Sequence, residues 1–382
     1  MEARPIRILH VLTIMNRGGA ETMVMNYYRN INRELVQFDF LLHRKETGAF
    51  DNEILSLGGK IYRMPSISPK NYFKYQKELE QFFDEHPEYQ VVHSHLNALS
   101  SIIFKVAMKK GIKTRIAHSH LAVEPFVFLK VFKPNTDIKA TIKDSTQSLI
   151  RRRVRHLATH YFACGEKAGD WLFGKSNRDK VKIINNAVNA KDFLYNPEIR
   201  KKVQNELGLE GRKIIGHVGR FNEQKNHFLL IDIFHSLLQK NPNCTLLLVG
   251  DGNLRSKIQN KVKQLGITKE VVFLGLREDI PELLQAFDLF LFPSLYEGLP
   301  VTLIEAQASG LKIVASDTIT NEVDLTGLIT FCGLTDPIDH WAEEVDKNLT
   351  YERKNMLNSI VQGQYDIVEN ARNLQEFYLK IY

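Results

Sequence analysis

Short hydrophobic runs recur along the 382-residue chain, and each is followed by a segment whose apolar residues have helical spacing. This alternation is typical of buried strands with covering helices, so it predicts an α/β fold with parallel sheets. In the first half the expected strands are residues 8–12, 38–42, 60–64, 91–94, 114–117, 160–163 and 181–184. In the second half they are residues 213–218, 245–249, 271–274, 289–292 and 313–315.

The series of strands restarts after a polar stretch at residues 185–196. A chain of 382 residues also exceeds what one hydrophobic core ordinarily organises. We therefore expect two Rossmann-like, doubly wound parallel sheets that face a cleft, with domains over residues 1–196 and 197–364 and an amphipathic helix over residues 365–382. Ligands of such sheets bind at the carboxyl ends of the strands, so the chemistry is expected there.

Composition narrows the class of protein. Hydrophobic residues make up 43% of the chain and charged residues 25%, which is typical of a soluble globular protein. The three cysteines, Cys164, Cys244 and Cys332, form neither a disulfide framework nor a metal-binding pair, which favours a reducing cytoplasm. No apolar run approaches the roughly 18 residues of a membrane span, and no signal peptide is evident.

The net charge of +7 is unevenly distributed. Residues 1–200 carry 32 Lys and Arg against 20 Asp and Glu, whereas residues 201–382 carry 19 against 24. Residues 101–155 alone hold 13 basic and 3 acidic side chains. Such a field attracts anionic lipid, phosphorylated substrates or nucleic acid, although lysine-rich surfaces also keep many proteins soluble.

Two predicted strand ends lead into glycine-containing loops. The first strand leads into Gly18 and Gly19 with a helix directly after, and a glycine lets backbone approach a ligand while a helix N-terminus attracts an anion. The spacing is not GxGxxG, and a tight turn explains the pair equally well. In the second half, Gly219 opens a loop with Arg220 and Lys225, two cations that can neutralise a diphosphate.

The stretch after residues 289–292 combines more signals. Pro300 is a helix-start signal, so the backbone of residues 298–302 can hold phosphate. Glu297 and Glu305 are eight residues apart, and each carboxylate can accept hydrogen bonds from vicinal hydroxyls of a sugar or ribose. The structural alternative is a helix-start glutamate followed by an ion-paired one.

Two His-Ser-His triplets, residues 93–95 and 118–120, follow consecutive strands. Alternation along a strand aims the outer histidines of each triplet to the same side, so a four-histidine metal cluster is one interpretation. No carboxylate or cysteine joins them at ligand spacing, and we expect hydrogen-bonded groups instead, with His118 placed to meet a substrate. The chain has no D-x-D pair, so no metal is expected.

Together these motifs resemble, over nearly the whole chain, the retaining GT-B glycosyltransferases of glycosyltransferase family 4, of the type that builds capsules and exopolysaccharides. The family's E-x7-E signature appears as Glu297 to Glu305, its G-R-x4-K loop as Gly219-Arg220 to Lys225, its strand-ending G-x-G as Gly250-Asp251-Gly252, and its N-terminal glycine loop as Gly18-Gly19.

The resemblance implies that a hexose or N-acetylhexosamine moves from a nucleotide-sugar, with UDP preferred, to a lipid-linked saccharide, without a cofactor. It implies an acceptor-binding first domain, a donor-binding second domain and a C-terminal helix that returns to the first. Arg220 and Lys225 would take the diphosphate, Glu305 the ribose and Glu297 the sugar. The implied donor-site residues are Gly18, Gly19, Gly219, Arg220, Lys225, Leu276, Arg277, Glu297, Gly298, Leu299, Pro300, Val301, Thr302 and Glu305. The implied catalytic residues are His118, Arg220, Lys225 and Glu297. His120 is assigned to the acceptor side and is the alternative to His118 as the catalytic-site histidine.

Two other functions stay open. A nucleotide-sugar 2-epimerase resembles the same fold but uses no acceptor, and the E-x7-E run argues against it. A non-catalytic module could bind anionic lipid or nucleic acid through the basic first half, but stacking and phosphate contacts would not require the four charged residues of the second half. We therefore expect no nucleic-acid partner.

The basic segment has a predicted role of its own. We expect residues 101–155 to face the anionic inner leaflet and the acceptor's lipid diphosphate, with Arg151, Arg152, Arg153 and the aromatic residues within 126–132. Each basic residue near such a surface contributes about 1 kcal/mol, so a cytoplasmic protein would associate peripherally with the membrane.

Overall fold

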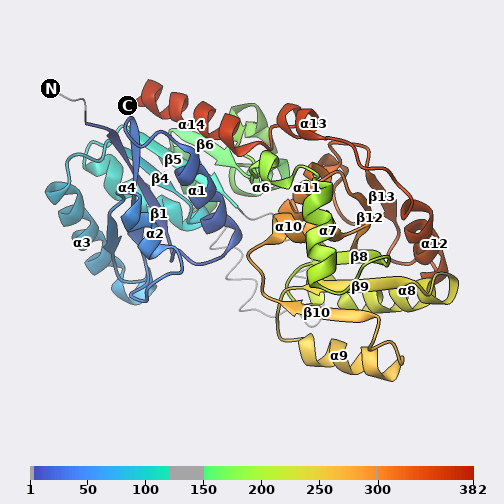
Figure 1. Ribbon diagram of the computed structural model, residues 1–382. Coiled ribbons are helices and arrows are strands. Elements are labelled where there is room, and N and C mark those ends of the chain that lie inside the picture. Colours follow the sequence, from blue (N-terminus) through green and yellow to red (C-terminus); the bar gives the residue numbers. More distant parts are fainter. Residues whose placement is uncertain (1–3, 121–149, 298) are drawn as a thin grey trace, which may run out of the picture. The chain divides into compact units, whose positions relative to one another are not determined.

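The computed structural model describes residues 4–120, 150–297 and 299–382 (Figure 1). The chain divides into two compact units: unit 1 is Met1–Ala187 with Ile367–Tyr382, and unit 2 is Val188–Asp366. The predicted boundary after residue 196 lies nine residues later than this division, because Val188, Ala190 and Phe193 are buried in the core of unit 2.

Unit 1 is built on a seven-stranded parallel sheet in the order β3-β2-β1-β4-β5-β6-β7. The strands are β1 (Ile6–Leu12), β2 (Val36–Leu42), β3 (Ile61–Arg63), β4 (Val91–Ser94), β5 (Thr114–Ser119), β6 (His160–Ala163) and β7 (Val181–Ile183). The main helices are α1 (Gly19–Asn30), α2 (Asp51–Ser56), α3 (Tyr72–Glu85), α4 (Ser100–Lys109), α6 (Glu166–Phe173) and α14 (Ile367–Ile381).

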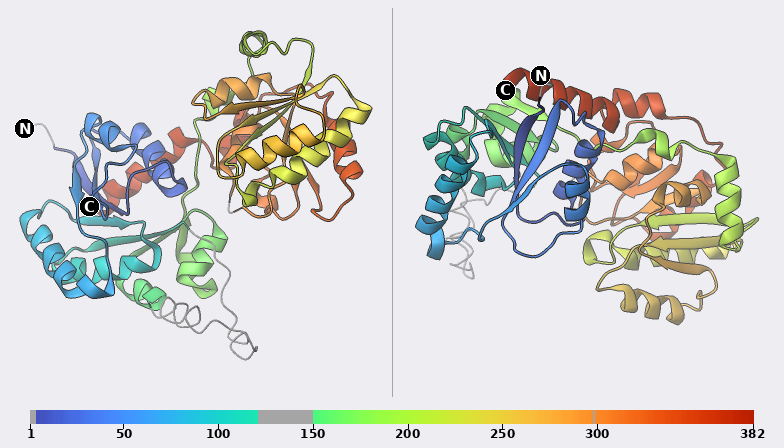
Figure 2. Two further views of the ribbon diagram at one scale, coloured as in Figure 1. Left: turned by 90° about the horizontal axis from the view of Figure 1, so that it is seen from below. Right: turned by 60° about the vertical axis from the view of Figure 1, so that its left-hand side comes forward.

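Helices cover both faces of this sheet (Figure 2). Helices α1 and α14 bury apolar side chains against one face, and α3, α4 and α6 bury theirs against the other. Helix α14 shares its buried face, which includes Leu374 and Tyr378, with β1, β2 and α1. The predicted return of the C-terminal helix to the first domain is therefore confirmed.

Unit 2 has a six-stranded parallel sheet in the order β10-β9-β8-β11-β12-β13. Its strands are β8 (Lys213–Val218), β9 (Cys244–Val249), β10 (Val271–Gly275), β11 (Leu289–Phe292), β12 (Lys312–Ser316) and β13 (Ile329–Cys332). Its helices are α7 (Pro197–Glu206), α8 (His227–Lys240), α9 (Arg255–Gln264), α10 (Ile280–Ala286), α11 (Val301–Ala308), α12 (Ile338–Asn348) and α13 (Leu357–Gln362).

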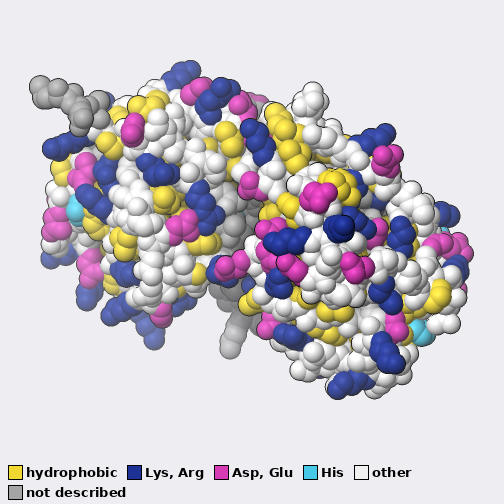
Figure 3. Space-filling view, viewed as in Figure 1, with side chains coloured by type: hydrophobic (Ala, Val, Ile, Leu, Met, Phe, Trp, Pro, Cys, Tyr) yellow, Lys and Arg dark blue, Asp and Glu magenta, His cyan; other side chains and the backbone are white. Residues whose placement is uncertain are grey.

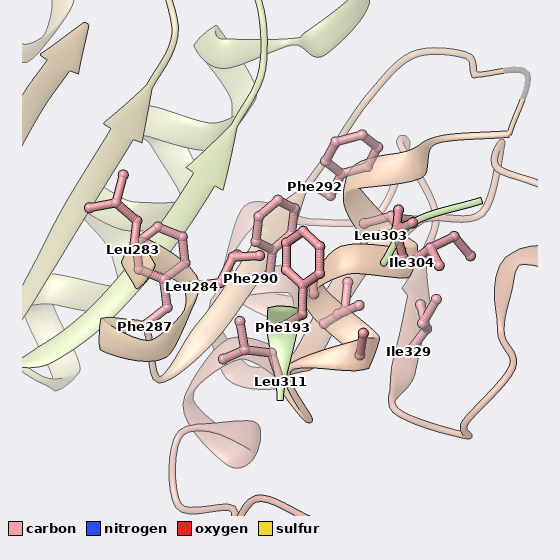
Figure 4. Close-up of a cluster of buried hydrophobic side chains, with 14 of the residues drawn as sticks. Phe193, Leu283, Leu284, Phe287, Phe290, Phe292, Leu303, Ile304, Leu311 and Ile329 are labelled. Atoms are coloured by element: carbon pink, nitrogen blue, oxygen red, sulfur yellow. The ribbon is translucent and has the colours of Figure 1, made fainter. Parts of the chain in front are cut away.

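The core of unit 2 also has two layers, one on each face of the sheet. In one layer, Phe290 and Phe292 of β11 pack with Leu303 and Ile304 of α11 (Figure 4). This contact fixes α11 against the strand that precedes it. The loop between β11 and α11 therefore has both of its ends anchored in the core.

The two sheets have the same order over six strands, and the sheet of unit 1 has one additional edge strand, β7. In both sheets the strand order reverses once. The reversal lies between β1 and β4 in unit 1 and between β8 and β11 in unit 2. All twelve expected strands are present, whereas β13, a four-residue edge strand, was not predicted. Within the described ranges, no helix is both long and apolar enough to cross a membrane.

Candidate active site

The strand ends on either side of the reversal in unit 2 carry the predicted donor residues. Doubly wound sheets bind ligands at this position, because the loops on its two sides diverge and leave a crevice. The loop after β8 carries Gly219, Arg220 and Lys225, and the loop after β11 carries Glu297 and leads into α11. The sequence motifs are therefore brought to one edge of one sheet.

Glycines hold the loop after β8 against the loop after β9. Gly250 has a φ of +132°, and a Cβ there would lie 2.1 Å from the carbonyl oxygen of Gly219. A Cβ at Gly252 would lie 2.4 Å from the carbonyl oxygen of Phe221. No side chain fits in either place, so the G-x-G motif fixes the backbone that carries Arg220.

Arg220 lies at this edge with an exposed side chain. In the part of the chain that the structure describes, its guanidinium has no hydrogen-bond or ion-pair partner. A guanidinium offers five N–H donors in a planar fork that matches phosphate oxygens. Arg220 is therefore available to bind a diphosphate without first breaking another contact.

Lys225 and Glu297, predicted as separate ligands of the donor, form an ion pair across the two loops. The Lys225 Nζ lies 2.7 Å from Oε1 of Glu297, and Gln224 donates from Nε2 to Oε2 at 3.1 Å. The two charged side chains are only 15% and 9% exposed. The ammonium also lies 4.4 Å from the centroid of the Phe292 ring. A ligand here therefore meets a preformed, nearly buried pair, to which Gln224 adds a contact that the motifs did not predict.

Helix α11 begins where the sequence predicted a start. Pro300 is the N-cap residue, and the first turn contains no acidic side chain. The backbone N–H groups of Val301 and Thr302 have no acceptor within the helix, which suits them to an anion. The Thr302 hydroxyl is buried and has no hydrogen-bond partner among the described residues. Gly298 lies outside those residues.

Glu305 lies on the same helix with a partly buried side chain. Burial raises its pKa to about 7. No hydrogen-bond or ion-pair partner for its carboxyl occurs in the described ranges, so the ion-paired alternative does not describe it. An unpaired, partly buried carboxyl at this position can accept hydrogen bonds from a diol.

Leu276 and Arg277 follow β10, two strands away from β8. Leu276 is 75% exposed, as an apolar side chain that borders a nucleobase would be. Arg277 instead donates from Nε to Asp279 at 2.7 Å. Its charge is therefore already engaged by a neighbouring carboxylate, unlike that of Arg220.

In unit 1, Gly18 is the N-cap residue of α1, and Gly19 is its first residue. A Cβ at Gly19 would meet no atom within 4 Å, so the described residues leave open space there. The carboxyl of Glu21 lies in the first turn, and burial raises its pKa. The geometry allows a ligand to approach the backbone at Gly19, as the motif predicted.

The two His-Ser-His triplets meet in the sheet of unit 1 together with a fifth histidine, His10 of β1. The Nδ1 of His10 lies 3.0 Å from Nε2 of His95, and Nδ1 of His95 lies 2.8 Å from Nε2 of His120. In a second row, Nε2 of His93 lies 3.2 Å from Nδ1 of His118. His10 was missed, although its place on the first strand, in register with His93, could have identified it.

These imidazoles are uncharged near neutral pH. Burial lowers the pKa of His10 to about 3 and that of His120 to about 4, and burial with neighbouring imidazoles lowers the pKa of His118 well below 6.5. Two groups of three histidines have a spacing at which a metal ion could be held, since one ring nitrogen of each residue lies within 4.8 Å of the others. These groups are His10, His93 and His95, and His95, His118 and His120. The nitrogen pairs that face each other are nevertheless at hydrogen-bond distance, which accounts for the cluster without an ion.

The structure corrects the expected position of His118. Strand β5 continues to Ser119, so His118 lies within the strand and His120 is the first residue after it. His118 is fully buried, yet its Nε2 has no partner among the described residues. His120 is partly exposed, yet its Nε2 is engaged by His95. As the histidine that contacts the substrate, His120 is favoured by its exposure, and His118 is favoured by its ring nitrogen without a partner among the described residues.

The three predicted membrane-facing arginines lie in a helical segment, residues 150–157. Arg151 donates to the carbonyl of Trp171 at 3.0 Å and lies 5.0 Å from the centroid of its ring. Arg152 and Arg153 are exposed. Two of the three arginines, Arg152 and Arg153, are therefore exposed enough to belong to the predicted membrane-facing surface. The aromatic residues of that surface, within 126–132, lie outside the described residues. On the face shown in Figure 3, basic and acidic side chains are interspersed.

Comparisons with known proteins agree with this architecture. Residues 17–192 match the model of Glycosyltransferase Family 4, and residues 199–355 match that of Glycosyl transferases group 1. The chain is thus a glycosyltransferase with two parallel-sheet domains of the GT-B type. It belongs to glycosyltransferase family 4.

Several relatives extend over nearly the whole chain. The putative glycosyltransferase EpsF of Bacillus subtilis is 39% identical over 99% of this chain and 97% of its own. A UDP-Gal:alpha-D-GlcNAc-diphosphoundecaprenol alpha-1,3-galactosyltransferase of Escherichia coli is 26% identical over 98% and 97%. The capsular polysaccharide biosynthesis glycosyltransferase CapH of Staphylococcus aureus is 25% identical over 98% and 99%. Among solved structures, Anabaena HepE in complex with UDP-glucose has a TM-score of 0.71 at 19% identity, over 98% of this chain and 99% of that one.

Proposed function

We propose that the protein is a retaining glycosyltransferase that moves a hexose or N-acetylhexosamine from a UDP-sugar to a lipid-linked saccharide in cell-surface polysaccharide synthesis. The observation that carries this proposal is the edge of the unit 2 sheet, where Arg220 and Glu305, both without a side-chain partner among the described residues, occur together with the N-terminus of α11. These groups suit a diphosphate and a ribose. The names of the E. coli relative and the HepE complex support UDP and a lipid diphosphate.

In the proposed reaction, the bond between the anomeric carbon and the diphosphate oxygen breaks. A bond from the acceptor oxygen to the same face of the anomeric carbon forms, and the acceptor's proton passes to the leaving phosphate oxygen. Same-face attack retains the configuration without a covalent intermediate on the protein. Arg220, Lys225 and the N–H groups of α11 stabilise the charge of the departing diphosphate, so the reaction needs no resident metal.

The ion pair of Lys225 and Glu297 fixes the positions of both side chains toward the donor. Because Glu297 and Phe292 hold the ammonium, Lys225 reaches the diphosphate from a fixed position. Glu297 keeps lone pairs for hydroxyls of the donor sugar. A neutral imidazole at His118 or His120 contributes a hydrogen bond to the sugar and not a charge.

The acceptor side of the proposal concerns unit 1. We propose that its basic surface, through Arg152 and Arg153, holds a cytoplasmic protein at the anionic inner leaflet, where a lipid-linked acceptor would lie. The exposure of both side chains supports this role, since an exposed guanidinium can reach a lipid phosphate without breaking a contact within the protein.

A panel of nucleotide-sugars in a thermal-shift assay tests the function. A bound donor at 100 times its dissociation constant adds about 2.7 kcal/mol to the free energy of unfolding, and Arg220→Ala should abolish that gain for the same donor. The donor that binds is then incubated with lipid-linked saccharides, and the products are separated. Isomerised donor without transfer would identify an epimerase, and tight RNA binding without a response to nucleotide-sugars would identify a binding module.

A further inference from the structure

Tyr378 of α14 makes a buried contact with the histidine cluster of unit 1. Its side chain is fully buried, and its hydroxyl lies 2.6 Å from Nδ1 of His93. Through Nε2, His93 lies 3.2 Å from Nδ1 of His118. A row therefore runs from the tyrosine hydroxyl through one imidazole to the next, and it ends at Nε2 of His118, which has no partner among the described residues.

The direction of this row follows from counting donors. The phenol keeps its proton, because burial raises the pKa of Tyr378 well above 10, and each neutral imidazole carries one N–H. In one direction, Tyr378 donates to His93, His93 donates to His118, and within the described part of the chain only the Nε2–H of His118 lacks a partner. In the other direction, both the phenol proton and the lone pair of His118 Nε2 lack partners within the described residues. Since each unmade buried hydrogen bond destabilises the folded protein, the first direction, which leaves fewer groups unpaired, is favoured.

We propose that Tyr378 is a positioning residue which, through His93, holds His118 as the tautomer protonated on Nε2, so that this imidazole offers an N–H donor to an oxygen of the bound sugar. The part of this inference that concerns the sugar rests on the proposed function. The tautomer itself is a property of the unliganded protein. In the complex, an oxygen of the sugar would accept the hydrogen bond from the Nε2–H of His118.

The other row of imidazoles, His10-His95-His120, contains no hydroxyl and provides an internal comparison. Its end at His10 has a buried Nε2 without a partner in the described ranges, so no donor fixes the direction of its protons. A change at Tyr378 should therefore alter the tautomers of His93 and His118 and leave those of His10, His95 and His120 in place.

Nitrogen NMR on the full chain labelled with ¹⁵N-histidine tests the tautomer without any substrate. Signals are assigned with His93→Gln and His118→Gln. We expect both His93 and His118 to be protonated on Nε2 and unprotonated on Nδ1. Tyr378→Phe, which keeps the ring and removes the hydroxyl, should move the nitrogen shifts of these two residues toward a mixture of tautomers. A wild-type His118 protonated on Nδ1 would overturn the proposal whether or not the variant folds.

Tyr27→Phe is the matched control. Tyr27 is buried in the same core, donates to the carbonyl of Asn185 at 2.9 Å and also interacts with the Asn370 side chain, so its variant also loses buried hydroxyl contacts. It should leave all five tautomers unchanged. Tyr378→Phe should lower kcat about 5-fold with little change in the donor KM, which corresponds to one partly lost hydrogen bond. An equal loss in Tyr27→Phe would assign the effect to packing. Expected tautomers without transfer activity would contradict the proposed function alone.

Discussion

The two sheets share the strand order around their reversal but carry different side chains there. In unit 2 the groups there are ionic: Arg220 is exposed and unpaired within the described residues, and Lys225 and Glu297 form a pair. In unit 1 the corresponding edge holds five imidazoles that burial keeps neutral. One sheet topology therefore carries charged side chains at one reversal of strand order and neutral hydrogen-bonding side chains at the other.

Among the variants that test this contrast, Arg220→Ala should lower kcat the most. Removing one fixed donor to a developing anion costs roughly 100-fold to 1,000-fold in kcat, and we expect a loss in that range. The melting temperature should not change, because the side chain has no partner in the described part of the chain. Lys263→Ala removes an exposed positive charge elsewhere in unit 2 and is the control. Turnover of Arg220→Ala within a few-fold of wild type would show that this charge is not used.

A second test separates the charge of Lys225 from its contribution to folding. Lys225→Met leaves the nearly buried Glu297 without its partner, which should destabilise the protein by about 3 kcal/mol. The double variant Lys225→Met with Glu297→Gln removes both charges and should recover most of that loss. Urea denaturation measures the midpoint for each protein.

Activity should follow a different pattern in the same variants. Both Lys225→Met and the double variant should be strongly impaired, because neither offers the ammonium to a diphosphate. If the double variant regained activity together with stability, the pair would be structural and the ionic description of unit 2 would be wrong.

The sequence predicted the ionic half of this contrast better than the neutral half. Arg220, Lys225, Glu297 and Glu305 lie in motifs of fixed spacing, and each follows or begins an element whose hydrophobic pattern is clear. The pairing of Lys225 with Glu297 could not be predicted, since it depends on two loops that are 72 residues apart.

The histidine cluster shows why the other half was harder to predict. The triplets were visible, but β5 continues two residues beyond its expected end, because His118 and Ser119 pair with β6. His10 and Tyr378 join the cluster only through the strand order and the return of α14. The edge strand β13 was missed, although three of its four residues are apolar.

Glu305 provides a test through pH. Its folded pKa of about 7 lies above the ordinary value of 4.5, so its ionisation opposes folding. The stability contributed by the protonated carboxyl is therefore fully retained below pH 4.5 and is lost as the pH rises toward and through 7. A shift of this size corresponds to about 3 kcal/mol, and the solvent contact of a partly buried group lowers the expected effect to about 2 kcal/mol.

Glu305→Gln has no such ionisation, so its melting temperature should rise relative to wild type between pH 5 and pH 8. Donor binding should in turn release protons near pH 6.5, because ribose hydroxyls stabilise the carboxylate. Calorimetry in buffers of different ionisation enthalpy measures that release. A stability difference that is constant with pH would mean that Glu305 is not buried in solution.

In unit 1 the charged groups to be tested are the surface residues Arg152 and Arg153 and not the neutral imidazoles, and their effect on vesicle binding should be modest. Arg152→Gln with Arg153→Gln should weaken binding to vesicles that contain anionic lipid by about 2 kcal/mol, or roughly 30-fold, at low salt. Arg151→Gln should instead lower the melting temperature, because it loses the contacts with Trp171. Lys263→Gln, which removes one charge from unit 2, is the control and should leave vesicle binding within about 2-fold of wild type. Equal losses at Lys263 and at the arginine pair would mean that vesicle binding reports net charge alone, and unit 1 would then have no membrane-facing surface of its own.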